Sequence, residues 1–364
     1  MKANALIYSE NEFGMIDGKV ANGLARHSDK YKILGIIDST KAGLDAGEYL
    51  DGIKNGIPVF ENIDEAIKKL GLVPEYFIYG IAPLASFLDR NQRKILLSAM
   101  KKGMNIVNGL PEFLSEDKEF ISKAGEYGVR IIDVRKPPLR KDLHNFSGSI
   151  RNIPTPVITV LGTDCAVGKR TTAVNLVEAL KEEGLNAVFI ATGQTGILQG
   201  SKYGIAVDVL SSGFATGEVE NAIINAYEKE NPDIFIVEGQ GALSHPAFTS
   251  SSAIIRGSMP DAIILQHPPK RKNHCDYPEI AMPTLESEIE LLEVFSKSKV
   301  IAITINHEDM SDIEVENTIV EYEYQYELPA TDVLKHGSAK LVKKIYELFP
   351  QLLISTPLIW QLQE

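Results

Sequence analysis

One glycine-rich turn, set between a buried strand and an amphipathic helix, limits the folds that this chain can adopt. An apolar run over Val157–Leu161 predicts a strand, and the pattern over Lys169–Glu183 predicts a helix with one apolar face. The turn between them contains Gly162, Gly168 and Lys169. In a parallel sheet, such a turn directs backbone N–H groups and a helix N-terminus at one anion. We therefore predict a phosphate-binding loop in an α/β domain.

The loop departs in two ways from the usual phosphate-binding pattern, which has four residues between the glycines and a Ser or Thr directly after the lysine. Five residues separate Gly162 from Gly168, and Arg170 follows the lysine. The hydroxyl that contacts Mg²⁺ must then come from Thr171 or Thr172, or water takes its place. A glycine turn with an incidental lysine is the alternative. The residues expected to contact a nucleotide are Gly162, Thr163, Asp164, Cys165, Ala166, Val167, Gly168, Lys169, Arg170, Thr171 and Thr172.

Acidic residues near the loop extend the predicted site. Glu238 follows the apolar run Ile234–Val237, where a carboxylate beside a phosphate loop supplies a second contact to Mg²⁺. A turn-forming acid is the alternative for this position. Asp164 either polarises a group of the bound ligand or caps the turn that follows it. The predicted catalytic residues are Lys169, Asp164 and His245, and the predicted metal ligands are Thr171 and Glu238.

Other polar residues that follow strands are candidates for substrate or nucleotide contacts. Thr192, Gln194 and Thr195 come after the strand predicted over Ala187–Ile190, although an ordinary Gly/Thr loop explains them equally well. Asn306, directly after the apolar run that ends at Ile305, is a candidate for contacting the nucleotide base.

A short basic run follows the strand predicted over Ala262–Leu265. Lys270 and Arg271 lie where an anionic substrate or a pyrophosphate would be met in an α/β sheet. A solvated loop is the alternative for this run.

Histidines also fall near the predicted site. His245 and His267 each precede a proline, and His274 lies in KRKNHCDYP. A packed or turn residue is the alternative to a base for each of them. His274 and Cys275 are adjacent, and the chain has no C-x-x-C or H-x₃₋₅-H pair, so the spacing does not predict a zinc site.

The chain alternates strand and helix patterns twice, which predicts two α/β domains. The first lacks the G-x-G-x-x-G turn of dinucleotide-binding proteins, so its Rossmann-like shape does not imply NAD. Between the two lies a stretch rich in Pro, basic residues and Ser/Gly. We predict a Rossmann-like domain over 1–134, a linker over 135–154, and a P-loop NTPase-like, doubly wound parallel-sheet domain over 155–364.

The amino-acid composition indicates which partners and which cellular compartment to expect for this protein. The net charge of −12 argues against nucleic acid or an anionic membrane surface as the main partner, because both are bound by clustered Lys and Arg. No stretch approaches the roughly 18–20 uninterrupted apolar residues of a membrane helix. Two cysteines cannot form a disulfide framework, and the N-terminus does not resemble a signal peptide. We expect a cytoplasmic protein with a small-molecule partner, and a homo-oligomer stays open.

Several stretches together resemble known families. The loop GTDCAVGKRTTA and the segment VEGQGALSHPAF are similar to the G-T-D-T-x-V-G-K-T and V-V-E-G-A-G-G patterns of dethiobiotin synthetase. With TGQTGI, LPATD, YGIAPLASFL and NIVNGLPEFLSED, nearly the whole chain resembles a family of two-domain bacterial P-loop proteins long classed as of unknown function. Some members of that family are described as D-glutamate N-acetyltransferase-like. The resemblance implies a Rossmann-like domain joined to a dethiobiotin-synthetase-like nucleotide domain.

Three functions remain compatible with the sequence. The leading hypothesis is an enzyme that binds ATP with Mg²⁺ and activates or N-acylates a small amino acid or carboxylate; the resemblance narrows this to amino-acid N-acetylation, as of D-glutamate. A second hypothesis places the phosphates of acetyl-CoA, rather than those of ATP, in the loop. A third is a nucleotide sensor without catalytic activity.

Overall fold

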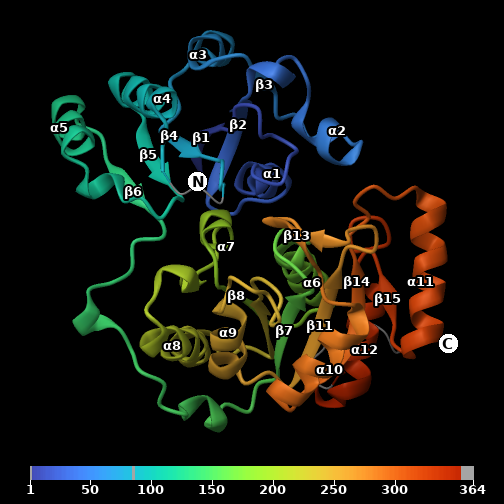
Figure 1. The fold of residues 1–364 in the computed structure, drawn as a ribbon. Coiled ribbons are helices and arrows are strands. Elements are labelled where there is room, and N and C mark those ends of the chain that lie inside the picture. The colour runs from blue at the N-terminus through green and yellow to red at the C-terminus, as the bar shows by residue number, and fades with distance from the viewer. Residues whose placement is uncertain (1, 84–86, 354–364) are drawn as a thin grey trace. The chain divides into compact units, whose positions relative to one another are not determined.

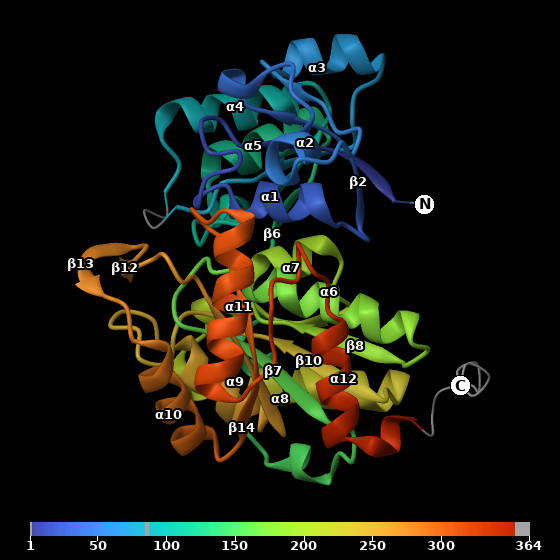
Figure 2. The same cartoon turned by 90° about the vertical axis from the view of Figure 1, so that its right-hand side faces the viewer.

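The protein consists of two compact α/β units. In the computed structural model, which describes residues 2–83 and 87–353, the first unit comprises Met1–Pro137 with Gln194–Ser201, and the second comprises Pro138–Gly193 with Lys202–Glu364. Helices lie on both faces of each central sheet (Figures 1 and 2). Residues 84–86, which belong to the YGIAPLASFL motif, lie outside the described residues.

The first unit has a Rossmann-like sheet, as predicted. Among the described residues its parallel strands follow the order β3-β2-β1-β4-β5-β6, which is the order of dinucleotide-binding folds. Alternate side chains of β1 enter different cores: Leu6 packs with α4 residues and Ile7 packs with α1 residues. The strands are β1 (Ala3–Tyr8), β2 (Tyr31–Ile37), β3 (Val59–Phe60), β4 (Tyr76–Tyr79), β5 (Asn105–Asn108) and β6 (Ile131–Asp133). The helices are α1 (Lys19–Arg26), α2 (Ala46–Asp51), α3 (Ile63–Leu70), α4 (Arg90–Lys101) and α5 (Lys118–Tyr127).

One helix of the first unit comes from a distant part of the chain. Helix α7 (Gln194–Gln199) follows a strand of the second unit and packs against α1. Leu198 is fully buried in the core on the α1 side of the sheet. The Gln199 side chain donates hydrogen bonds to the backbone oxygens of Gly23 and His27, at 2.8 and 3.0 Å. These contacts satisfy carbonyls at the C-terminal end of α1.

The second unit has a parallel sheet with the strand order β15-β14-β11-β7-β10-β8-β9 among the described residues. Strand β7 is buried along its whole length, as its continuous apolar sequence predicts. Helices α6 and α12 contribute to one core, and α8 contributes to another. The strands are β7 (Val157–Gly162), β8 (Ala187–Ala191), β9 (Tyr203–Gly204), β10 (Ile234–Glu238), β11 (Ala262–His267), β14 (Lys299–Ile305) and β15 (Ala330–Thr331), with an antiparallel pair β12 (Asn273–His274) and β13 (Tyr277–Ala281). The helices are α6 (Lys169–Glu182), α8 (Ser212–Glu230), α9 (Ser250–Ser258), α10 (Leu285–Ser296), α11 (Asp312–Tyr326) and α12 (Ala339–Leu348).

The segment that enters the second unit is anchored to α8. Glu218 accepts a hydrogen bond from the backbone N–H of His144 at 2.5 Å, and Glu220 accepts one from that of Ser147 at 2.6 Å. Both glutamates are at least nine-tenths buried. Most of the segment predicted as a linker thus belongs to the second unit, where two buried carboxylates accept hydrogen bonds from its backbone.

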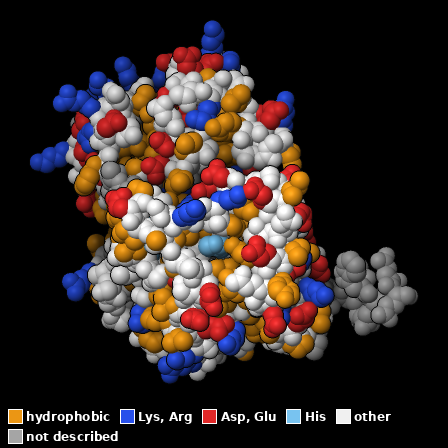
Figure 3. Space-filling view, turned by 45° about the vertical axis from the view of Figure 1, so that its right-hand side comes forward, with side chains coloured by type: hydrophobic (Ala, Val, Ile, Leu, Met, Phe, Trp, Pro, Cys, Tyr) orange, Lys and Arg blue, Asp and Glu red, His pale blue; other side chains and the backbone are white. Residues whose placement is uncertain are grey.

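Two features of the described residues bear on membranes and charge: the apolar length of the helices and the charged side chains at the surface. No helix in the described ranges is long and apolar enough to cross a membrane. On the face shown in Figure 3, acidic side chains recur and are interspersed with basic and apolar ones.

Candidate functional site

The glycine loop lies at the carboxyl end of β7, between strands β10 and β11. Gly168 adopts φ +101°, a left-handed conformation that L-residues avoid, and α6 begins at the next residue. A Cβ on Gly162 would come within 2.9 Å of Lys169 Cδ. Gly168 is thus favoured by its backbone conformation, and Gly162 leaves room for the Lys169 side chain. The loop has the strand–turn–helix setting that the sequence predicted.

Lys169 is buried under the loop that precedes it. Its Nζ donates a hydrogen bond to the backbone oxygen of Asp164 at 2.5 Å. Burial lowers the pKa of Lys169, while the nearby Cys165, Asp164 and Cys275 act in the opposite direction. The ammonium group therefore has one loop carbonyl as its partner, a contact that an anion could replace.

Asp164, in the middle of the loop, accepts hydrogen bonds at both carboxylate oxygens. Oδ1 accepts from His274 Nδ1 at 2.7 Å, and Oδ2 accepts from Arg271 Nη1 and the backbone N–H of Cys275, both at 2.9 Å. Burial opposes ionisation of this carboxyl, but the bonds from His274, the backbone and Arg271 hold its pKa below the usual range. Asp164 is therefore a buried carboxylate that joins the loop to the segment around β12.

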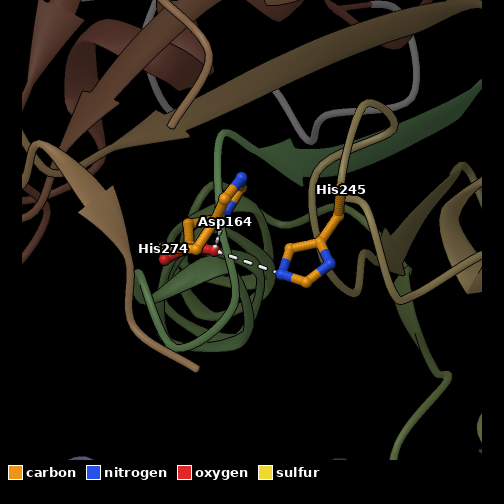
Figure 4. A group of neighbouring side chains, drawn as sticks. All are labelled: Asp164, His245 and His274. Carbon is orange, nitrogen blue, oxygen red and sulfur yellow. Dashed lines mark hydrogen bonds and ion pairs between the residues drawn. The ribbon is translucent and has the colours of Figure 1, made fainter. Parts of the chain in front are cut away.

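Two histidines converge on this carboxylate, as Figure 4 shows. The rings of His245 and His274 meet edge to face, with centroids 4.4 Å apart. His245 Nε2 lies 3.7 Å from Asp164 Oδ1 and has no hydrogen-bond partner in the described structure. Burial, followed by the charge of His274, lowers the pKa of His245. Cys165 and Asp276 also place a sulfur and an oxygen within 4.8 Å of the His245 ring.

Asp164, His245 and His274 are close enough to hold a metal ion, since each offers one atom within 4.8 Å of the others. The hydrogen bonds of these three side chains fit proton transfer better than metal binding. A metal-bound imidazole normally donates its second N–H, whereas His245 Nδ1 accepts two backbone N–H groups, at 3.2 and 3.3 Å. The Arg271 guanidinium, bound to the same carboxylate, would repel a further cation. We therefore interpret the group as an acid–base cluster.

The contact with Asp164 indicates which tautomer the neutral His274 ring adopts. Because the ionised Asp164 accepts at Nδ1, the neutral His274 ring carries its proton there and its lone pair at Nε2. A buried carboxylate that orients an imidazole in this way favours its action as a base.

The predicted metal ligands are not arranged as a pair of free oxygens. Thr172, 1% exposed, donates its hydroxyl to Gln266. Glu238 is also buried, and its Oε2 accepts the backbone N–H groups of Thr192 and Gly193, at 3.0 and 3.3 Å. Thr171 lies one residue beyond Arg170 on α6. A role of Thr171 and Glu238 in metal binding stays a prediction.

The predicted substrate residues separate into different surroundings. Arg271 is buried and donates to the backbone oxygen of Cys165 at 2.9 Å as well as to Asp164, so its guanidinium braces the loop. Lys270 lies at the surface and pairs with Glu314. Asn306, just after β14, accepts a hydrogen bond from the backbone N–H of Glu308 at 3.1 Å.

The polar residues after β8 are divided between the two units. Thr192 belongs to the second unit, where its hydroxyl donates to the Glu238 backbone oxygen at 2.9 Å. Gln194 and Thr195 begin α7 of the first unit and are both buried. The predicted contact of these three residues with a substrate stays a prediction.

The remaining histidine beside the loop is neutral. His267 Nδ1 lies 2.8 Å from the hydroxyl of Thr163. Burial, with the charge of Arg271, lowers the pKa of His267 to about 4. His267 therefore cannot contribute a positive charge near neutral pH.

Sequence reasoning did not establish the role of two residues in this region. The sequence leaves His274 open between a base and a packed or turn residue, and it does not pair His274 with Asp164, 110 positions away. Glu288 on α10 is fully buried and accepts from the backbone N–H of Leu243 at 2.6 Å and from the Ser244 hydroxyl at 2.6 Å. It thereby holds the segment that carries His245. A glutamate in the apolar face of α10 is the one signal that could have pointed to it.

Comparisons with known proteins match both units. A family model described as the DUF1611 P-loop domain, of unknown function, matches residues 144–342, and a model described as the DUF1611 Rossmann-like domain matches residues 39–137. A D-glutamate N-acetyltransferase of a Pseudoalteromonas species is 33% identical over 276 residues, which are 74% of this chain and 80% of that protein. One from Tritonibacter scottomollicae is 28% identical over 271 residues, 73% of this chain and 79% of that protein.

A solved structure extends the match to nearly the whole chain. The crystal structure of a DUF1611 family protein from Anabaena variabilis is 29% identical, with a TM-score of 0.87, and the match covers 95% of this chain and 100% of that one. The resemblance inferred from the loop and strand-end motifs is thereby confirmed. This chain belongs to the DUF1611 family, which joins a Rossmann-like domain to a P-loop domain.

Proposed function

We propose that this protein transfers an acetyl group from acetyl-CoA to the amino group of an acidic amino acid such as D-glutamate. The names of two relatives support the reaction class. The loop suits a donor that carries phosphates, because Gly168 and the start of α6 direct backbone N–H groups outward from β7. Acetyl-CoA has a diphosphate and a 3′-phosphate that such a loop could hold.

The single observation that carries the proposal is the buried Asp164–His274 pair joined to the loop. An amino acid is protonated at neutral pH, and its ammonium group must lose a proton before the nitrogen can attack a thioester. The lone pair on His274 Nε2 would accept this proton, and Asp164 would stabilise the resulting imidazolium. A new C–N bond then forms as the C–S bond breaks, the nitrogen gives up a second proton, and coenzyme A leaves as the thiolate, which takes up that proton.

The neighbours of His274 fit this role. His245 lies edge-on against the His274 ring, and its buried Nε2, which has no hydrogen-bond partner among the described residues, could donate to a carboxylate or carbonyl oxygen bound beside it. Glu288 keeps the His245 segment in place through three hydrogen bonds. The two histidines would thus have different tasks, one as base and one as hydrogen-bond donor.

The test is an assay for acetylated product by mass spectrometry. The protein is incubated with D-glutamate, L-glutamate or D-aspartate, and with either acetyl-CoA or acetate plus ATP-Mg²⁺. We expect N-acetyl-D-glutamate with acetyl-CoA. We expect His274→Ala to lower kcat by about 10²–10⁴-fold, the usual contribution of a general base, while coenzyme A still binds.

The matched control is His336→Ala, because His336 pairs with Glu316 at 3.3 Å, outside the cluster, and is partly exposed. This variant should keep full activity. Product formed only with acetate and ATP-Mg²⁺ would contradict the choice of donor. Unchanged kcat in His274→Ala would rule out His274 as the base.

A further inference from the structure

We infer that Arg170 takes the place of the divalent metal in this loop, so that the loop grips phosphate with the Lys169 and Arg170 side chains and needs no Mg²⁺. The inference rests on the proposed function only in that a phosphate group must enter the loop. It specifies the class of ligand: a phosphate ester or diphosphate that is bound directly, such as the phosphates of coenzyme A, rather than a metal–nucleotide complex.

The residue after the lysine decides how a phosphate loop holds its metal. In metal-dependent loops this residue is a Ser or Thr whose hydroxyl is a ligand of Mg²⁺. In this chain the position holds Arg170, the second residue of α6. A guanidinium cannot bind a cation, but it forms paired, charge-assisted hydrogen bonds with phosphate oxygens. The substitution exchanges a metal ligand for a phosphate ligand.

The two following threonines cannot restore the missing oxygen. Thr171 and Thr172 lie one and two residues further along α6, and each step turns the side-chain direction by about 100° around the helix. Neither therefore points where the residue after the lysine points. The Thr172 hydroxyl is moreover buried and donates to Gln266 Oε1, which also accepts from Thr304 at 2.6 Å.

The remaining candidate ligand, Glu238, already has an arrangement suited to a side-chain cation. Its Oε2 accepts two backbone N–H groups, those of Thr192 and Gly193. Burial raises the pKa of Glu238, and the positive charge of Arg170 is the largest influence that lowers it. The Arg170 Nε is itself buried. The charge of Arg170 thus acts on Glu238, in the part of the site where a metal-dependent loop pairs an acid with Mg²⁺.

The charges around the loop also favour an anion over a metal–anion complex. Lys169 and Arg170 are adjacent cations at the start of α6, whereas the nearby Arg271 is already paired with Asp164 and Glu308. A divalent ion placed beside Lys169 and Arg170 would be repelled, whereas a phosphate dianion would be attracted by both and by the N-terminus of α6.

The test measures the dissociation constant of coenzyme A by calorimetry with excess EDTA and again with excess Mg²⁺. The wild-type protein should bind equally in both. Arg170→Thr restores the hydroxyl of metal-dependent loops, and we expect it to weaken binding in EDTA by about tenfold or more, the loss of one charge-assisted contact. Part of that affinity should return with Mg²⁺. Arg151→Thr, at an exposed position, is the matched control and should bind like the wild type.

A second variant guards against a folding defect. Arg170→Lys keeps the charge, so it should retain binding in EDTA better than Arg170→Thr does. Wild-type binding that requires Mg²⁺, or equal affinity of Arg170→Thr and wild type in EDTA, would overturn the inference. Absence of binding to coenzyme A and to ATP under both conditions would overturn the phosphate site itself, and with it the proposed donor.

Discussion

Gly162 has no room for a side chain, since a Cβ there would meet both Lys169 Cδ and Val167 Cγ2 at 2.9 Å. Alanine must displace the flexible lysine from the loop. We predict that Gly162→Ala weakens coenzyme A binding by about tenfold, the loss of roughly one charge-assisted hydrogen bond, as measured by calorimetry. The matched control is Gly213→Ala in the first turn of α8, where a Cβ meets nothing within 4 Å. Equal affinities in the two variants would contradict this account of the lysine.

At the scale of elements, Glu288 links α10 to the segment that carries His245. We predict that Glu288→Ala lowers the free energy of unfolding by about 1–3 kcal/mol, because the donors at Leu243 and Ser244 lose their buried acceptor. Glu288→Gln keeps an acceptor and should be milder. Urea unfolding measures both. An equal loss of unfolding free energy in the two variants would show that the hydrogen bonds to Glu288 do not account for the destabilisation.

The same glutamate gives a pH dependence whose sign follows from its pKa. Burial raises the pKa of Glu288, opposed by the hydrogen bonds from Ser244 and Leu243. The folded protein therefore holds this proton more tightly than the unfolded chain. The resulting stability is present below the ordinary glutamate pKa and is lost as the pH rises through the raised value. Glu288→Gln should lack this part of the decline when urea midpoints are compared across that range.

The strands differ in how well they can be predicted from the sequence. Strands such as β7 and β11 are continuous apolar runs, and both were predicted to within two residues. The two-residue strands β3, β9, β12 and β15 were not predicted, because two residues cannot display a period of two. The predicted loop lay in consecutive residues. The Asp164–His274 contact was invisible because only the tertiary fold brings those residues together.

For the whole molecule, the first unit depends on α7, which the chain supplies after Gly193. We predict that the fragment Met1–Pro137, made alone, leaves α1 poorly protected, because Leu198 and Gln199 no longer cover it. Hydrogen exchange read by mass spectrometry should show faster exchange in α1 of the fragment than in the full chain. Helix α4 packs in the other core of this unit and is the internal control. Equal protection of α1 in fragment and full chain would contradict the prediction.

Because the first unit is discontinuous in sequence, it also limits the order in which the units can fold during synthesis. The ribosome delivers the chain from its N-terminus, and domains generally fold as they emerge. The N-terminal unit of this protein cannot finish first, however, since it lacks a helix until Ser201 has left the ribosome. By then β7, the glycine loop, α6 and β8 have been made as well. A nascent chain must therefore leave α1 without its α7 contacts while the phosphate-binding loop is already taking shape.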